Sequence, residues 1–564
     1  MCHIESTRDR LQGIVIFLQY HSICDGQYIS KQSAPVSASI FSIGEIARVS
    51  STFYNFSAHN IMASQAVNAV ACIITAVIIY LLINLIRIRQ NRGRYAKEHN
   101  CQPAIHFPHQ EPFLGLDLFW QLIKSTKDKR RMESTKKLYD HYGLTWQSTS
   151  FGREVINTID PENIQSVMAQ DFESWGLAPL RYPAAGPFMG RGVFTSDGPF
   201  WQYARAQVKP VLTRAQFTDY ERLESHLQTF FQVLPKNGED VDVLPLLERL
   251  FTDTMTEFLL GDSVDTLLGN SSLDHQAFLD SFTAAAQGVG KRILLGKLKF
   301  LFPDKKFKDA CHSIFKFIDG RIDQTFAYLQ IQEVAKKSPE EKEPLVFIRE
   351  LAKQTKDREL IAAQVLNVLN AANDGAAIVI SHIVFFLSRY PEVQKKLRDE
   401  VSVIGDKKPD YEELRNMKYL RYIINETLRL YPLVPTNGRI ALKDTFLPRG
   451  GGPDGRSPVF VKEGTHYSTN SYVLHRREEF WGKDAEEFKP ERWETHRQGW
   501  EYQAFGGGAR TCPGQAFVLS EIGYTVVRIL QQYKEIESRD DRVWVENLKL
   551  TMSNAHGVVI GLVP

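Results

Sequence analysis

Cys512 and its neighbours form the part of the sequence that is best suited to chemistry. Three consecutive glycines precede the cysteine, and their lack of side chains lets the backbone fold closely around whatever the sulfur faces. A helix that begins near Pro513 would point its N-terminal amides and the positive end of its dipole at the sulfur, which favours thiolate over thiol. The segment therefore predicts a metal-bound thiolate. Its specified positions follow the pattern F-x-x-G-x-R-x-C-x-G and are Phe505, Gly508, Arg510, Cys512 and Gly514.

Two other interpretations of this segment are a purely structural cysteine and a phosphate-binding loop. A lone buried cysteine is more often structural than reactive, but a pattern with this many specified positions seldom arises by chance. A phosphate-binding loop needs Gly-Lys-Ser/Thr after its glycines, and neither this segment nor PRGGGPDG at Pro448 has that sequence. The six cysteines include no C-x-x-C pair, so neither a disulfide framework nor a zinc ribbon is predicted.

The cysteine motif resembles the haem-binding loop of the cytochromes P-450, the haem-thiolate monooxygenases. Upstream, INETLRLYP carries Glu426 and Arg429, which match the E-x-x-R helix of the family, and FKPERW carries Arg492, which matches the partner arginine. Residues three apart share one face of a helix, so Glu426 and Arg429 can pair locally while Arg492 completes a structural triad. The resemblance implies a cytochrome P-450 fold, in which a helical domain with a long central helix encloses haem.

The resemblance also implies the cofactor and the residues that hold it. Haem b, which is iron protoporphyrin IX, would take the Cys512 thiolate as its axial ligand. Its two propionates would need cations beside them, and the planar guanidinium group suits bidentate contact with carboxylates. The positions that match propionate-binding residues are Trp201 and Arg205 in W-x-x-x-R, Arg439 in VPTNGR, and Arg510.

Residues 360–390 have very few charges, which predicts a buried helix through the centre of the body. In the family this helix carries an acid followed by a threonine, and the pair delivers protons during oxygen activation. Asp374 matches the acid, but Gly375 stands where the threonine belongs and Ala372 where a glycine does. Ala371 and Gly375 are both small and four apart, so we expect them to leave room above the haem and Gly375 to loosen the helix. A water or a substrate hydroxyl would replace the missing alcohol.

Membership of this family implies a monooxygenase that incorporates one atom of O2 into its substrate. The chain has no evident flavin or nicotinamide fingerprint, so we expect electrons from NADPH through a separate NADPH-cytochrome P-450 reductase. Two alternatives stay open. One is an isomerase or a peroxide-using enzyme, which needs no reductase. The other is a haem-binding sensor or carrier without turnover, which the glycine at position 375 favours.

The region between the E-x-x-R helix and the cysteine motif is similar to the fungal branch of the family that hydroxylates alkanes and fatty acids. The similarity includes LPRGGG, the following DG-x-SP, and GKDAEEFKPERW. It implies a lipophilic substrate with a long aliphatic chain. The alternative is a tailoring oxidase in a fungal secondary-metabolite pathway, because specificity depends on pocket residues that vary under a common fold.

An apolar segment near the start of the chain predicts a membrane anchor. Residues 66–86 contain no charge, and 21 residues of helix span about 30 Å, the thickness of the hydrocarbon core of a bilayer. Residues 87–100 form a basic juxtamembrane linker, so the positive-inside rule places the rest of the chain in the cytosol. We expect a single-pass protein of the endoplasmic reticulum membrane. Residues 1–65 form an extension to which no role is assigned.

Residues 101–564 are expected to form one mainly α domain with a small β region. Helical patterns dominate, whereas residues 458–476 alternate and are rich in β-branched and aromatic side chains, as in a small sheet. No repeat or Pro/Gly linker divides this part. The 68 basic and 66 acidic residues nearly cancel, which argues against a nucleic-acid partner.

Overall fold

The computed structural model describes residues 43–218, 220–335 and 344–564. The chain divides into two units at Ile88 and Arg89, and each is described by itself. Most of residues 1–65, the predicted extension, lies outside the described part, and the remainder belongs to the helix of the first unit.

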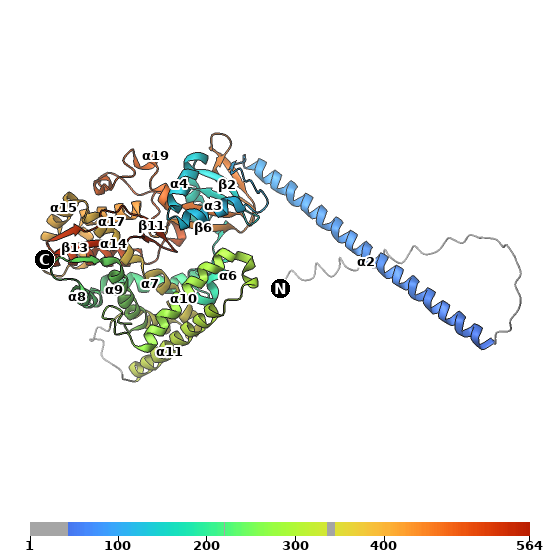
Figure 1. Ribbon diagram of the computed structural model, residues 1–564, viewed down its shortest axis with the longest axis horizontal. Coiled ribbons are helices and arrows are strands. Elements are labelled where there is room, and N and C mark those ends of the chain that lie inside the picture. The colour runs from blue at the N-terminus through green and yellow to red at the C-terminus, as the bar shows by residue number, and fades with distance from the viewer. Residues whose placement is uncertain (1–42, 219, 336–343) are drawn as a thin grey trace. The chain divides into compact units, whose positions relative to one another are not determined.

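The first unit contains helix α2 (Ile43–Glu98), which continues into the second unit (Figure 1). Its stretch Asn68–Glu98 is long and apolar enough to cross a membrane, with a mean hydropathy of 2.7 in its most apolar window. The Thr75 hydroxyl donates to the carbonyl of Ala71 at 2.9 Å, which satisfies this polar group inside the apolar run. The predicted span, residues 66–86, lies within this helix, and most of the predicted linker is helical as well.

The second unit is mainly α. Its longer helices are α3 (Leu116–Lys127), α4 (Arg131–Tyr142), α6 (Ala178–Met189), α7 (Gly198–Thr218), α8 (Tyr220–Val233), α9 (Val243–Leu260), α10 (Leu273–Leu295), α11 (Lys305–Ala335), α12 (Phe347–Gln354), α13 (Arg358–Ala372), α14 (Gly375–Leu387), α15 (Pro391–Ser402), α17 (Lys418–Leu430) and α20 (Gln515–Gln532). Its short helices are α5 (Pro161–Gln165), η3 (Ser166–Gln170), η4 (Phe172–Ser174), η5 (Gly296–Leu301), α16 (Tyr411–Asn416), α18 (Ser471–Leu474), α19 (Glu478–Trp481), η6 (Pro490–Glu494) and η7 (Gly508–Arg510).

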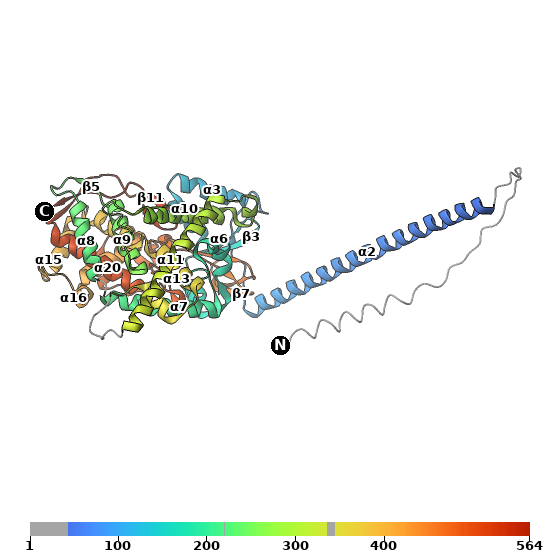
Figure 2. The same cartoon turned by 90° about the horizontal axis from the view of Figure 1, so that it is seen from below.

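In the described part of the chain, the strands form four small sheets. The largest has the order β1-β2-β3-β9-β6-β4, a second has the order β10-β13-β5, and β7-β8 and β11-β12 are antiparallel pairs. Figure 2 shows β5 beside the C-terminal end, as its antiparallel pairing with β13 requires. The strands are β1 (Ile105–His106), β2 (Thr145–Ser150), β3 (Arg153–Thr158), β4 (Trp175–Gly176), β5 (Asp240–Asp242), β6 (Thr436–Ala441), β7 (Thr445–Gly451), β8 (Ser457–Val461), β9 (His466–Asn470), β10 (Glu535–Ser538), β11 (Glu546–Leu548), β12 (Met552–Asn554) and β13 (Val559–Val563).

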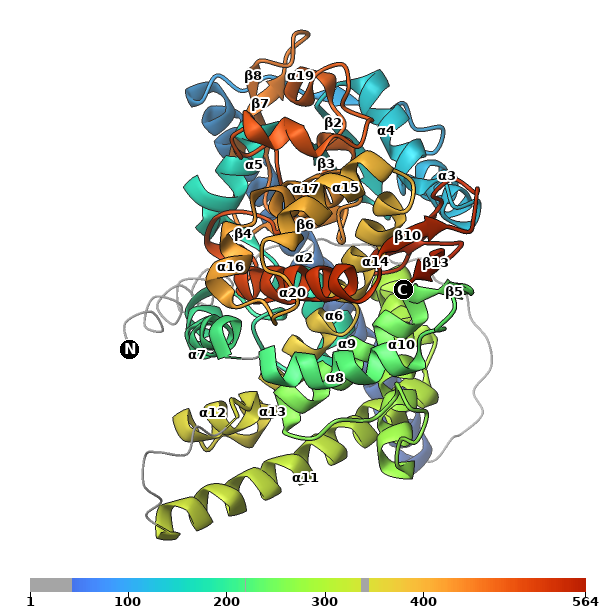
Figure 3. The same ribbon diagram turned by 90° about the vertical axis from the view of Figure 1, so that its left-hand side faces the viewer.

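Within the second unit, α14 and α20 lie between an end that holds β2, β3 and α4 and an end that holds α8 and α11 (Figures 1 and 3). The alternating segment 458–476 forms β8 and β9, but these strands belong to different sheets. Gly464 has φ +84°, and the turn there redirects the chain. β8 pairs with β7, whereas β9 pairs with β3 and β6.

The predicted central helix is two helices, α13 and α14, rather than one. Every residue of α14 is buried, which explains why its sequence is apolar on all faces. The helix breaks at Asp374, whose φ of −121° and ψ of −11° are not helical. Gly375 begins the second segment, and a glycine has a low preference for a helix interior. The break therefore places Asp374 at a bend in the core.

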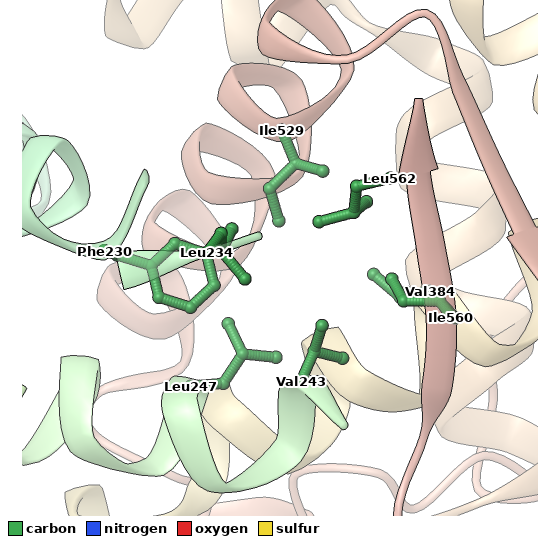
Figure 4. A pocket seen from close by; sticks show the side chains of 8 residues that line it. All are labelled: Phe230, Leu234, Val243, Leu247, Val384, Ile529, Ile560 and Leu562. Atoms are coloured by element: carbon green, nitrogen blue, oxygen red, sulfur yellow. The ribbon is translucent and has the colours of Figure 1, made fainter. Parts of the chain in front are cut away.

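A small apolar gap remains where α8, α9, α14, α20 and β13 meet (Figure 4). Only apolar side chains surround it, so it offers no polar group to orient a substrate. Its lining consists of Phe230, Leu234, Val243, Leu247, Val384, Ile529, Ile560 and Leu562.

Candidate active site

The loop before Cys512 has a conformation that depends on glycine. Gly508 has φ +62°, and a Cβ at this position would lie 1.8 Å from the carbonyl oxygen of Met168. A side chain is therefore excluded there by both backbone conformation and space. The Cys512 amide donates to the carbonyl of Phe505 at 3.0 Å and closes the loop. The motif thus folds tightly around the cysteine.

Cys512 precedes α20, which starts at Gln515 with Gly514 as its N-cap, two residues later than predicted. Cys512 keeps exposed surface, but the atoms around it desolvate the sulfur, and this burial raises the pKa of its thiol. The Gly514 amide and the Arg205 guanidinium act in the opposite direction. The amide at the helix terminus therefore acts toward the thiolate, as expected, but burial outweighs it in the protein alone. A bound metal cation would supply the missing stabilisation of the Cys512 thiolate, because coordination deprotonates a thiol.

Three arginines gather around a single carboxylate. The Arg510 guanidinium donates to Asp197 at 2.5 Å and to the carbonyl of Ser196 at 2.9 Å. Burial lowers the pKa of Arg510 to about 10. The nearby Arg439 acts in the same direction, and Asp197 acts in the opposite direction. Burial and the nearby Arg439 and Arg510 likewise lower the pKa of Arg181 to about 10. Buried Arg439 leaves its Nε without a hydrogen-bond partner among the described residues.

This cluster suits a dianionic group. Buried cations require counter-charges or hydrogen-bond acceptors, and Asp197 balances only one of the three guanidinium groups. Trp201 is 5% exposed, and the Arg510 guanidinium lies 4.3 Å from its ring, so its indole N–H is a further donor at this cluster. The two propionates of haem match this excess of positive charge. Arg181 and Asp197 were not predicted from sequence; their only local signals are an arginine within apolar APLRYPAAG and an acid just before W-x-x-x-R.

Arg205 contacts the cysteine loop. It lies one turn after Trp201 on α7 and donates to the carbonyl of Thr511 at 2.7 Å. Its charge also acts on Cys512. Arg205 therefore supports the cysteine loop directly, because the Thr511 carbonyl lies within its reach.

The predicted triad residues are in contact. Arg429 donates to both carboxylate oxygens of Glu426, at 2.9 and 2.8 Å, and Arg492 donates to one of them at 3.1 Å. Glu426 and Arg429 are fully buried. Trp493 donates its indole N–H to Glu426 at 3.0 Å, and Arg429 reaches the carbonyl of His475 at 2.7 Å. This network fixes α17 to the segment that leads toward the cysteine loop.

His475 continues the network and was missed in the sequence, where nothing distinguishes it from a surface histidine. It is fully buried, and burial lowers its pKa to about 3, so the ring is neutral. The Gln503 amide donates to Nε2 at 2.8 Å, so Nδ1 carries the proton and donates to the carbonyl of Arg429 at 3.0 Å. One imidazole thus connects the triad to the residues just before Phe505.

The break between α13 and α14 separates the two small residues that we expected to act together. Ala371 is exposed although its helix is otherwise mostly buried, which leaves space beside it. Gly375 is buried, and a Cβ there would lie 3.2 Å from Cδ2 of Leu433. The room expected beside Gly375 is therefore largely filled by Leu433.

Comparison with known proteins agrees with this geometry. The family model of Cytochrome P450 matches residues 110–556. "Cytochrome P450 monooxygenase himC" of Aspergillus japonicus is 36% identical over 89% of this chain and 90% of its own length. "Cytochrome P450 52A13" of Debaryomyces hansenii is 36% identical over 83% of this chain and 93% of its own length. With its cysteine loop, buried triad and arginine cluster, this chain belongs to the cytochrome P450 monooxygenase family, which uses haem on a cysteine thiolate.

Proposed function

We propose that this protein is a membrane-anchored monooxygenase that hydroxylates an aliphatic chain, with Cys512 as the axial ligand of haem b. The reaction combines a C–H substrate, O2, two electrons and two protons to give the alcohol and water. Haem held by a thiolate supplies the oxygen-activating chemistry of such a reaction. The chain supplies the ligand, the counter-charges and the route for protons.

The single observation that carries this proposal is the position of Cys512 next to an excess of buried positive charge. Arg510 lies two residues before Cys512 and pairs with Asp197, while Arg181 and Arg439 add two cations without adding a carboxylate. A thiol and a dianion-binding cluster at one place are what a haem with two propionates requires. Trp201 would donate to the same propionates.

The substrate proposal depends on resemblance and on the membrane helix. The alkane- and fatty-acid-hydroxylating branch, which this chain resembles, takes long aliphatic substrates. Lipophilic molecules also concentrate in a bilayer, so an anchored enzyme meets them there. A tailoring oxidase for a secondary metabolite is the second candidate, and the glycine at position 375 favours it because the chain departs there from its resemblance to that branch.

We further propose that residues 66–86 cross the endoplasmic reticulum membrane once and that residues 101–564 form the cytosolic catalytic domain. The cations that follow the apolar run support this orientation. One of them, Arg92, pairs with Asp444 of the body at 2.9 Å. Electrons would come from NADPH through NADPH-cytochrome P-450 reductase in the same membrane.

Cys512→Ala tests the ligand assignment. The wild type, reduced and treated with carbon monoxide, should show the Soret band of a thiolate-ligated haem, and the variant should lack it. Cys311→Ala is the matched control, because Cys311 is also a free cysteine but is buried in α11. A thiolate band that persists in Cys512→Ala would refute the assignment.

Reconstitution tests the activity. The full-length protein, with reductase and NADPH, should convert members of a panel of alkanes and fatty acids to alcohols. Product with peroxide but never with reductase would point to a peroxide-using enzyme. A thiolate band without turnover of any compound would point to the sensor or carrier.

A further inference from the structure

Asp374 has a hydroxyl partner, but the partner does not come from its own helix. Thr551, on the turn between β11 and β12, donates its hydroxyl to Oδ2 of Asp374 at 2.7 Å. The two residues are 177 positions apart in the chain. An acid and an alcohol are therefore paired at the break in the central helix although position 375 carries no side chain.

Leu433 explains why the alcohol comes from another element. It occupies the space beside Gly375, so a threonine side chain at 375 would collide with it unless it moved. The carbonyl of Leu433 accepts a hydrogen bond from the Met552 amide at 2.9 Å. Met552, which follows Thr551, is therefore attached to the residue that packs beside Gly375. The β11–β12 turn is thus anchored where it can reach Asp374.

The surroundings of Asp374 include a second acid. Glu248 on α9 lies near enough that its charge and that of Asp374 interact, and burial together with this repulsion raises the pKa of Glu248. Burial also raises the pKa of Asp374, against the hydrogen bond from Thr551 and the nearby Lys549. Asp242 adds negative charge on the side of Glu248. The two carboxyl groups therefore hold protons to a higher pH than isolated acids do.

Helix α9 is hydrogen-bonded to the residue that precedes the break in the central helix. Thr252 donates to Oδ1 of Asn373 at 3.2 Å and to the carbonyl of Glu248 at 2.8 Å. One hydroxyl thus joins the backbone of Glu248 to the residue before Asp374. Lys549, two residues before Thr551, is exposed, so the β11–β12 turn reaches solvent.

We propose that Thr551 takes over the part of the alcohol that is absent at position 375, and that it holds Asp374 where this acid can pass protons into the active site. This inference rests on the proposed monooxygenase function, in which two protons and two electrons from the reductase accompany each O2. Each proton would reach Asp374 from water and leave it for the oxygen that becomes water. Thr551 is a positioning residue for Asp374.

Thr551→Val tests the proposal, because valine keeps the shape of threonine but has no hydroxyl. The first measurement is an infrared pH titration of the haem-loaded, substrate-free protein, in which Asp374→Asn identifies the carboxyl band of Asp374. Loss of the hydrogen bond removes stabilisation of the charged carboxylate, so the band should titrate at higher pH in Thr551→Val. Thr551→Ser should restore the titration of the wild type.

The second measurement is the fate of the electrons during NADPH oxidation with reductase. Thr551→Val should release more hydrogen peroxide per NADPH and form about 10-fold less product. This loss is smaller than the roughly 100-fold or more that general acid catalysis contributes, because Asp374 itself remains. Thr551→Ser should recover the yield. Thr325→Val is the matched control, because it removes a buried threonine hydroxyl that only caps a carbonyl in α11.

These readouts separate this proposal from the proposed function. A normal thiolate band in each variant shows that haem binding is intact, and neither the titration nor the peroxide yield requires the correct substrate. A Thr551→Val protein with both the titration and the peroxide yield of the wild type would overturn the role of Thr551. A change in the titration without a change in peroxide yield would overturn the proton route.

Discussion

The acids Glu426 and Asp374 are held in opposite ways. Glu426 is fully buried, and its two oxygens accept hydrogen bonds from Arg429, Arg492, Trp493 and the Lys489 amide. Asp374 is only half-buried, and its carboxylate receives one side-chain hydrogen bond, from a neutral hydroxyl. A carboxylate that several charged donors hold is fixed in one geometry and stabilises structure, whereas one with a single neutral donor is held less firmly. The contrast separates a structural acid from a functional one.

Glu426→Ala should have the largest effect on stability. It leaves the buried guanidinium of Arg429 without its counter-charge, which costs about 3 to 5 kcal/mol. The midpoint of urea unfolding should fall accordingly, or folded haem protein should fail to accumulate. Glu162→Ala breaks the exposed pair with Arg449 and should cost less than about 1 kcal/mol. Equal losses in the two variants would show that the triad is not structural.

His475→Leu should have an intermediate effect. It leaves the Gln503 amide and the Arg429 carbonyl without partners inside the protein, at about 1 to 3 kcal/mol for each unsatisfied group. Because His475 adjoins the cysteine loop, the thiolate band of the reduced carbon-monoxide form should also weaken. His475→Gln can both accept and donate, so it should recover part of the band and of the stability. A full thiolate band in His475→Leu would limit this residue to packing.

Asp374→Asn should have the smallest effect, and the effect should depend on pH. Burial raises the pKa of Asp374 in the folded protein above its value in the unfolded chain, which is about 4. The protonated acid therefore favours folding at a pH below the unfolded pKa, and this contribution to stability is lost as the pH rises through the folded pKa. The side-chain amide of the asparagine has no charge that burial would penalise, and its oxygen can still accept the hydrogen bond from Thr551. The variant should therefore gain up to about 1 kcal/mol relative to the wild type at neutral pH and nothing at low pH.

Thermal unfolding at several pH values measures this difference. The exposed Asp541→Asn is the control, and its stability should follow that of the wild type at every pH. A loss of stability in Asp374→Asn at neutral pH would place Asp374 with Glu426 among the structural acids.

The contacts that could be predicted from the sequence join residues within one short sequence motif. Glu426 and Arg429 are one turn apart, so helix geometry alone brings them together. The glycine at position 508 and the cysteine four residues later belong to one loop. The low helix preference of glycine predicted a weak point near Gly375, and the chain does break there.

The contacts that sequence did not predict connect distant segments. Thr551 and Leu433 approach the helix break from the β11–β12 turn and from the end of α17, and no local pattern marks either residue. Arg181 joins Arg439 and Arg510 only because α6, β6 and the cysteine loop converge. The orientation of Arg205 toward Thr511 likewise depends on where α7 meets that loop.

The arginine cluster has a consequence for how this enzyme is made. Before the cofactor binds, the three guanidinium groups repel one another and only one acid lies between them. This repulsion destabilises the folded arrangement of the arginine cluster. Binding of a dianion reverses that repulsion, and its free energy adds to the stability of the folded chain. A cell short of porphyrin would accumulate a loosened, protease-sensitive form, so the supply of haem would also set the amount of this protein.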